Sequence, residues 1–146
     1  HSSHNNSWAP FTAWALRQNI PLHLMPGNHD ILADRRYAEA GLQVCDDTLE
    51  EGPFVFAHEP QDRPGVYGIG GHIHPGVVLS GQARQRLRLP CFWFGERLAI
   101  VPAFGLSTGL HVIRPERTDR VYACTERAVL DVNGAFAGRA TSPRTK

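Results

Sequence analysis

Three short segments of the sequence carry side chains that bind metal ions. They are GNHD at residues 27–30, AHEP at residues 57–60 and GHIH at residues 71–74, and each follows a short apolar stretch. Imidazole is a good ligand for Zn, Mn, Fe and Ni, whereas an amide oxygen such as that of Asn28 suits harder cations. A mixed set of His and Asn therefore predicts a Mn-, Fe- or Zn-type site rather than a thiolate zinc site.

Each segment alone also has an ordinary structural explanation. His58 could be a loop histidine, GNHD could be an asparagine turn with a polar tip, and the two histidines of GHIH need not be ligands. The occurrence of all three segments in one chain, each at the end of a predicted strand, favours a metal site. The glycines before Asn28 and His72 allow the sharp backbone turns and the close approach of a ligand that such a site needs.

The surrounding sequence predicts the elements that position these segments. Ser7 is expected to cap a helix that runs to about residue 18, and residues 21–25 are expected to form a strand. Asp34 is expected to cap a short helix that stops at Gly41. A strand, a loop and a helix in this order form an α/β unit, in which the functional loop leaves the carboxyl end of the strand.

From residue 42 onward the pattern is one of strands and turns. The expected strands cover residues 42–45, 48–49, 54–57, 66–70, 77–79, 84–94, 98–101, 121–124 and 128–132. Arg84, Arg86 and Arg88 alternate with Leu87 and Leu89, which predicts one solvated face and one buried face. We predict an α/β fold with a single domain over residues 1–132 and a disordered tail over residues 133–146.

Length and composition limit the class of protein. The chain has 146 residues, of which 42% are hydrophobic and 20% charged, as in one globular domain. No apolar run approaches the ~20 residues of a membrane-spanning helix, so no membrane association is predicted. The net charge of +1 excludes a partner held by bulk attraction. The Arg-rich strand could meet a polyanion, although a solvated face is an equal alternative.

The three cysteines Cys45, Cys91 and Cys124 are widely spaced and odd in number. This pattern argues against a disulfide framework and against a CxxC zinc site. It fits buried structural thiols in a reducing cytosol.

The order GNHD, a His after a short strand, and then GHIH resembles the last three blocks of the calcineurin-like metallophosphoesterases. The resemblance implies an α+β sandwich with sheets flanked by helices, and two divalent metal ions, with Mn first and Fe, Zn or Co as alternatives. It implies three ligands for one ion and one for the other, namely Asn28, His58 and His72, and then His74. It also implies that His29 protonates the leaving oxygen and that Asp30 orients His29.

Four segments resemble a narrower bacterial family, the ligase-associated DNA-damage-response phosphoesterases. They are HEP at 58–60, GHIHP at 71–75, LRLPCFWF at 87–94 and VPAFG at 101–105. This resemblance implies a cytoplasmic endonuclease or phosphodiesterase of DNA repair, which acts on nucleic acid and is associated with a DNA ligase and a helicase. Judged by residue type alone, LRLPCFWF is a core strand and PAFG is a buried aromatic corner.

The superfamily's opening Asp-x-His and Gly-Asp blocks have no counterpart in this sequence. His1 resembles the histidine that follows the Gly-Asp block and contacts the substrate phosphate. The resemblance therefore implies that the N-terminal part of the domain is missing and that this fragment is inactive or weakly active. One alternative is a non-catalytic metal-binding module that binds nucleic acid or a repair partner. Another is a phosphomonoesterase or nucleotide phosphodiesterase of the same fold outside DNA repair.

Overall fold

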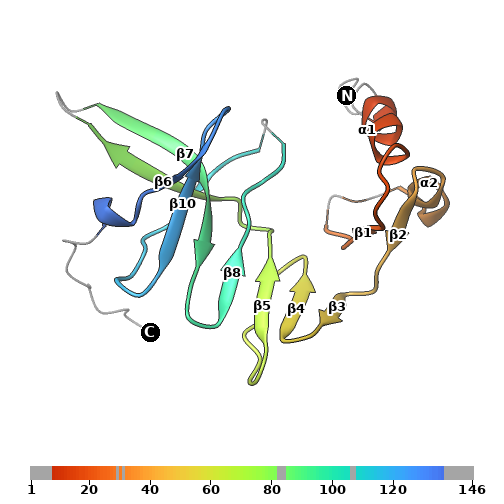
Figure 1. The fold of residues 1–146 in the computed structure, drawn as a ribbon, viewed down its shortest axis with the longest axis horizontal. Coiled ribbons are helices and arrows are strands. Elements are labelled where there is room, and N and C mark those ends of the chain that lie inside the picture. Colours follow the sequence, from red (N-terminus) through yellow and green to blue (C-terminus); the bar gives the residue numbers. More distant parts are fainter. Residues whose placement is uncertain (1–7, 29, 31, 82–84, 106–107, 137–146) are drawn as a thin grey trace. The chain divides into compact units, whose positions relative to one another are not determined.

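The computed structural model describes residues 8–28, 30, 32–81, 85–105 and 108–136. Ser7 and Arg84 lie outside these residues, as do two of the candidate site residues, His1 and His29. Where the sequence predicts one domain, the chain divides into two compact units, residues 1–49 and residues 50–146, whose elements are drawn in Figure 1. Among the described residues, no helix is long and apolar enough to span a membrane.

The first unit is a parallel pair of strands packed with two helices. Strands β1 (Leu22–Leu24) and β2 (Leu42–Val44) run in parallel. Helices α1 (Trp8–Ala15) and α2 (Asp34–Glu39) share a cluster with them, and the rings of Trp8 and Tyr37 meet edge to face at 5.7 Å. The cluster consists of buried Tyr37, Ala40 and Leu42 surrounded by Trp8, Phe11, Leu22, Leu24 and Val44. The predicted α/β unit is confirmed.

Helix α2 differs from the prediction at its start. Ala33, not Asp34, is the N-cap residue, and Asp34 is the first residue of the helix. A carboxylate in the first turn still stabilises the helix through the helix dipole. The predicted stop is confirmed, because Gly41 has a φ of +79° and its N–H donates to the carbonyl of Ala38.

A sheet of nine strands among the described residues lies in the second unit, except that its edge strand β3 begins two residues earlier, at Thr48. The strand order is β11-β10-β7-β8-β5-β4-β3, with β6 paired to β7 and β9 paired to β6. The strands are β3 (Thr48–Glu51), β4 (Phe54–Ala57), β5 (Tyr67–Gly70), β6 (Pro75–Ser80), β7 (Arg86–Phe94), β8 (Leu98–Ile100), β9 (His111–Val112), β10 (Arg120–Cys124) and β11 (Val129–Asp131). Parallel and antiparallel pairs both occur, so this is a mixed sheet, and the predicted α/β class is confirmed.

Three neighbouring strands of this sheet are parallel. In register, Ala57 of β4 lies opposite Gly70 of β5, and Gly70 lies opposite Ile100 of β8. Because neighbouring parallel strands end at the same edge of a sheet, the segments that follow β4, β5 and β8 leave from one edge. The histidine-bearing segments 57–60 and 71–74 both belong to this edge.

The core of the second unit is built on β6, β7 and β10. The buried cluster consists of Val77, Cys91, Val121, Ala123, Val132 and Phe136. The predicted core strand is confirmed around Cys91, which has no exposed surface. The predicted burial of Leu87 is wrong, since this residue is 56% exposed. It pairs with Leu79 beside the turn that connects β6 to β7.

The structure continues past the predicted boundary at residue 132. A 3-10 helix, η2 (Asn133–Ala135), follows, and Phe136 is buried in the core cluster. The side-chain Oδ1 of Asn133 accepts a hydrogen bond of 2.8 Å from the N–H of Val121 in β10. Residues 133–136 are therefore part of the fold rather than of a disordered tail. The composition around Gly134 resembles a linker, and a single buried Phe gives no periodic signal. Residues 137–146 lie outside the described residues.

Candidate metal centre

Two of the predicted ligands, His58 and His72, are in contact at the carboxyl edge of β4 and β5. The Nδ1 atom of His72 lies 2.9 Å from the Nε2 atom of His58. The two rings are nearly perpendicular, with their centroids 4.8 Å apart. One ring nitrogen donates this hydrogen bond and the other accepts it. The donating nitrogen would have to lose its proton before both atoms could bind one metal ion.

The glycines of β5 set the position of the His58 segment. A Cβ atom at Gly70 would lie 2.6 Å from the carbonyl oxygen of Ala57 and 2.7 Å from Pro60. A Cβ atom at Gly68 would lie 2.5 Å from the carbonyl oxygen of Gln61. Only a strand without side chains at these positions lets the segment that follows β4 lie flat against β5. The main-chain hydrogen bond from Gly71 N–H to the carbonyl of His58, at 3.0 Å, fixes the two segments together.

Both histidines of the GHIH segment have an unusual backbone conformation. His72 has a φ of +67° and His74 has a φ of +52°, and they are the only described non-glycine residues with positive φ. The left-handed conformation is unfavourable for a residue with a Cβ atom, and such residues gather at functional sites. The bend therefore holds His72 and His74 in conformations that local sequence preference would not select.

The connection between β8 and β9, residues 101–110, is fixed to this bend at both ends. At its start, the N–H of Val101 donates to the carbonyl of Gly70 at 2.7 Å. Directly after its end, the N–H of His111 donates to the carbonyl of His74 at 3.0 Å. The prediction that PAFG forms a buried aromatic corner is wrong, since Phe104 is 96% exposed. The sequence motif identified this aromatic residue but gave no sign of its exposure.

The donor chemistry of the pair fits a divalent ion. Histidine nitrogens bind such ions at about 2.0–2.1 Å, so two of them on one ion lie about 3 Å apart. The observed separation of 2.9 Å between the ring nitrogens agrees with this spacing. In the part of the chain that the structure describes, no group of three or more His, Cys, Asp or Glu side chains comes together in this way. Among the described residues, the pair therefore offers two adjacent nitrogen donors.

The other predicted site residues belong to the first unit. Asn28 is exposed in the segment after β1, and Asp30 follows two residues later. The Oδ2 atom of Asp30 accepts a hydrogen bond of 2.8 Å from the N–H of Gly27, and the N–H of Asp30 donates to the carbonyl of Gly27 at 3.0 Å. The carboxylate therefore stabilises its own turn, a function that the sequence analysis did not anticipate.

Comparison with known proteins finds similarity among solved structures. The sequence matches no protein-family model and no curated protein. Among solved structures, the chain is similar to the nuclease MPE of Pseudomonas putida, with a TM-score of 0.69 and 35% sequence identity. The similarity covers 85% of this chain and 60% of the nuclease chain. The two proteins therefore share a fold over the matched region, and this chain spans about 60% of the length of that nuclease.

Proposed function

We propose that the protein is a metal-dependent nuclease that hydrolyses phosphodiester bonds in nucleic acid. The observation that carries the proposal is the contact of 2.9 Å between His58 and His72 at the edge of two parallel strands. The 35% identity to a nuclease supports this interpretation of the pair. The motif resemblance adds two metal ions, with Mn as the first candidate, a role in DNA repair beside a DNA ligase and a helicase, and a cytoplasmic location.

The residues of this chain have distinct functions in the proposed reaction. By the motif resemblance, His58, His72 and Asn28 would hold one ion, and His74 would hold the second. When bound, such ions lower the pKa of a water molecule and stabilise charge on the attacking and leaving oxygens of a phosphodiester. His29 donates a proton to the leaving oxygen, because imidazole can give up a proton near neutral pH. Asp30 orients His29, and His1 contacts the phosphate.

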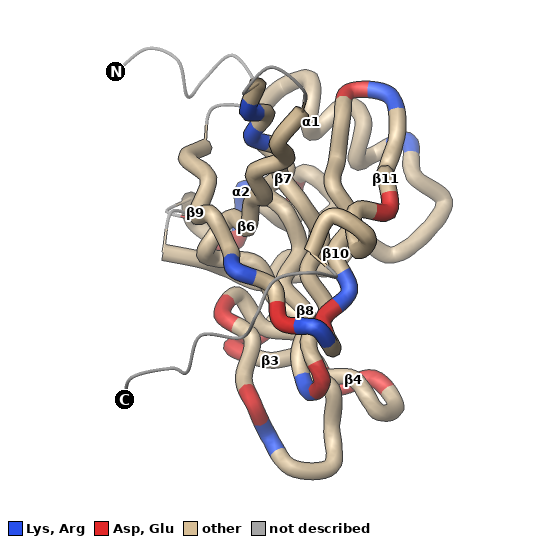
Figure 2. The backbone as a smooth tube through the Cα atoms, turned by 90° about the vertical axis from the view of Figure 1, so that its left-hand side faces the viewer, with Lys and Arg blue, Asp and Glu red and all other residues tan. Residues whose placement is uncertain are grey.

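Substrate attraction in this proposal depends on local groups of arginine residues. Basic and acidic residues are interspersed along the chain rather than separated by sign (Figure 2). The net charge of +1 provides little long-range attraction for a polyanion. Contacts with phosphates must therefore come from particular side chains near the site.

The test compares Mn²⁺-dependent cleavage by the wild type, His72→Ala and His23→Ala, each made from the complete reading frame. The substrates are a chromogenic phosphodiester and a DNA oligonucleotide. We expect His72→Ala to lose at least about a hundredfold in turnover. Mutation of residues that only hydrogen-bond to metal ligands already lowers metal affinity or activity by roughly 10–100-fold, and the loss of a ligand itself should cost more. His23 is an exposed histidine on β1 outside the proposed ligand set, so His23→Ala is expected to keep wild-type activity.

Calorimetric titration with Mn²⁺ separates the proposal from its alternative. Loss of both Mn²⁺ binding and cleavage in His72→Ala supports a metal-dependent nuclease. A wild type that binds Mn²⁺ through His72 but cleaves neither substrate would instead support the non-catalytic binding module. Undiminished Mn²⁺-dependent cleavage by His72→Ala would contradict the proposed ligand set.

A further inference from the structure

Phe104 is the most exposed large apolar side chain in the described part of the chain, with 96% of its surface accessible. Single exposed apolar residues are common on protein surfaces and need no special explanation. The position of Phe104 is what distinguishes it, because it lies in the connection between β8 and β9 that starts beside Gly70 and ends beside His74.

This connection is anchored near Phe104 by described contacts. Its first residue, Val101, lies close to the histidine bend, since its Cγ2 atom is 3.8 Å from the position of a Cβ atom on Gly71. Farther along, the Oγ1 atom of Thr108 donates to the carbonyl of Gly105 at 2.9 Å. An aromatic ring is thus presented to solvent from a segment bonded on both sides to the bend that carries His72 and His74.

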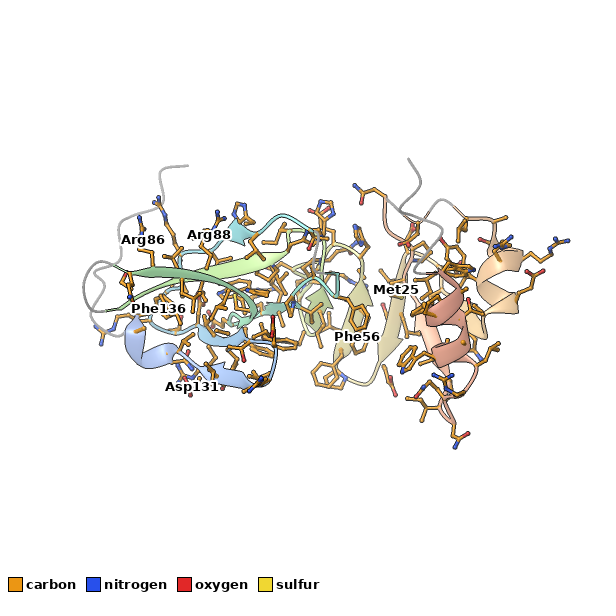
Figure 3. The ribbon with its side chains drawn as sticks, turned by 90° about the horizontal axis from the view of Figure 1, so that it is seen from above. Met25, Phe56, Arg86, Arg88, Asp131 and Phe136 are labelled. Carbon is orange, nitrogen blue, oxygen red and sulfur yellow. The ribbon has the colours of Figure 1, made fainter. Side chains whose placement is uncertain are left out.

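A cationic side chain lies at the other end of the same connection. The Nη2 atom of Arg88 donates to the carbonyl of Leu110 at 3.1 Å, one residue before His111. Arg86 and Arg88 extend from the same side of β7 (Figure 3). A guanidinium group has five N–H donors, so one bond to Leu110 leaves others for a phosphate. Aromatic and arginine side chains together are the usual contacts of an unpaired nucleic-acid strand.

We propose that Phe104 stacks on a nucleobase of the substrate beside the histidine site, while Arg88 contacts a phosphate of the same strand. This inference rests on the proposed nuclease function and assigns a specificity-determining residue to it. A base has an aromatic face whatever its identity, so Phe104 selects for an accessible base rather than for a sequence. A phosphodiester without a base offers nothing for the ring to stack on.

The first experiment compares two single-stranded substrates of equal length, oligothymidylate and an oligomer of abasic sugar phosphates. We expect Phe104→Ala to lower kcat/KM for oligothymidylate about tenfold and to leave cleavage of the abasic oligomer unchanged. Phe104→Trp is expected to stay within about twofold of the wild type, because indole also stacks. Equal loss on both substrates, or no loss on oligothymidylate, would overturn the inference.

Phe54→Ala is the matched control. Phe54 is 41% exposed at the start of β4, the opposite end from His58, so its loss is expected to leave the preference for thymidylate unchanged. Thermal unfolding gives a second control. Phe104→Ala should keep the wild-type Tm, whereas a Tm several degrees lower would show that the ring packs against protein and would also overturn the inference.

A binding measurement makes the inference independent of cleavage. An oligonucleotide containing 2-aminopurine, mixed with metal-free protein, reports stacking as a loss of fluorescence. We expect quenching with the wild type and about tenfold weaker binding with Phe104→Ala. Quenching without cleavage would refute the proposed nuclease function but support the stacking function of Phe104. Absence of quenching with the wild type would refute the stacking function alone.

Discussion

Cys91 shows at the level of a single residue how burial controls the chemistry of a side chain. It has no exposed surface and belongs to the core cluster of the second unit. Burial, and to a smaller extent the nearby Cys124, raises the pKa of the Cys91 thiol from 9.0 to about 12. The thiolate is the reactive form of cysteine, so Cys91 is protected both by its lack of exposure and by its protonation.

We expect Cys91 to resist a thiol reagent at pH 8 in the native protein, and the half-buried Cys45 to react. All three thiols should react in guanidinium chloride. The contribution of Cys91 to stability should be complete below about pH 9 and should fall as the pH rises toward 12, because the unfolded thiol ionises first. Unfolding free energies measured against pH check this, and Cys91→Ala should remove that part of the pH dependence. Rapid native labelling of Cys91 would contradict the assignment.

At the residue scale, the sequence revealed side-chain chemistry better than conformation. Residue type and position after strands predicted that His58 and His72 lie near each other, and their contact at 2.9 Å confirms this proximity. Their function as metal ligands stays a prediction. The left-handed backbone of His72 and His74 could not be predicted, because the adjacent Gly71 was the natural candidate for the turn. The exposure of Phe104 could not be predicted either, since residue type indicates apolar character and not what covers the side chain.

At the scale of elements, the packing of the β4–β5 connection on β5 determines the position of the histidine pair. Gly70→Ala would place a Cβ atom 2.6 Å from the carbonyl oxygen of Ala57 and 2.7 Å from the ring of Pro60. Neither group is the end of a flexible side chain, so the segment must move. We expect a loss of about 2–3 kcal/mol of unfolding free energy, measured by urea unfolding, together with weaker Mn²⁺ binding.

The neighbouring glycine is the control for this prediction. A Cβ atom at Gly71 would meet no atom closer than the Cγ2 of Val101, at 3.8 Å. Gly71→Ala should therefore change the unfolding free energy by no more than about 0.5 kcal/mol. Equal stability of the two variants would show that the close packing against Gly70 does not hold the His58 segment in place.

The positions of the strands were easier to predict than which strands pair with each other. The strand at residues 54–57 was predicted with its observed bounds, because a compact apolar run is bounded by turn residues. The parallel pairing of β5 with β8 joins residues about thirty positions apart, and no local pattern specifies it. Strand β9 was missed, since a strand of two residues shows no alternation. The contact between His58 and His72 depends on the pairing of the successive strands β4 and β5, whereas the pairing of β5 with β8 is long-range and was not revealed by the sequence.

At the scale of the whole molecule, the described residues form two apolar clusters. One, around Tyr37, Ala40 and Leu42, lies in the unit of residues 1–49. The other lies in the unit of residues 50–146 and includes Phe136 near the end of the described chain. The change from helical to strand patterns near residue 42 was visible in the sequence. The extent of the second cluster was not visible in the sequence, because Phe136 is far along the chain from most of the residues it packs against.

The end of the second unit can be located by comparing two shortened chains. A chain ending at Val132 lacks the hydrogen bond from Val121 to Asn133 and the buried ring of Phe136. Loss of a buried Phe side chain alone reduces stability by about 3–5 kcal/mol, so we expect at least this reduction in the unfolding free energy. A chain ending at Phe136 retains both contacts and should therefore be more stable than the chain ending at Val132 by at least this amount. Urea unfolding of the three chains tests this, and equal stability of the chains ending at 132 and 136 would contradict it. Phe136→Ala in the full chain should reproduce most of the loss, because the expected effect comes mainly from that ring.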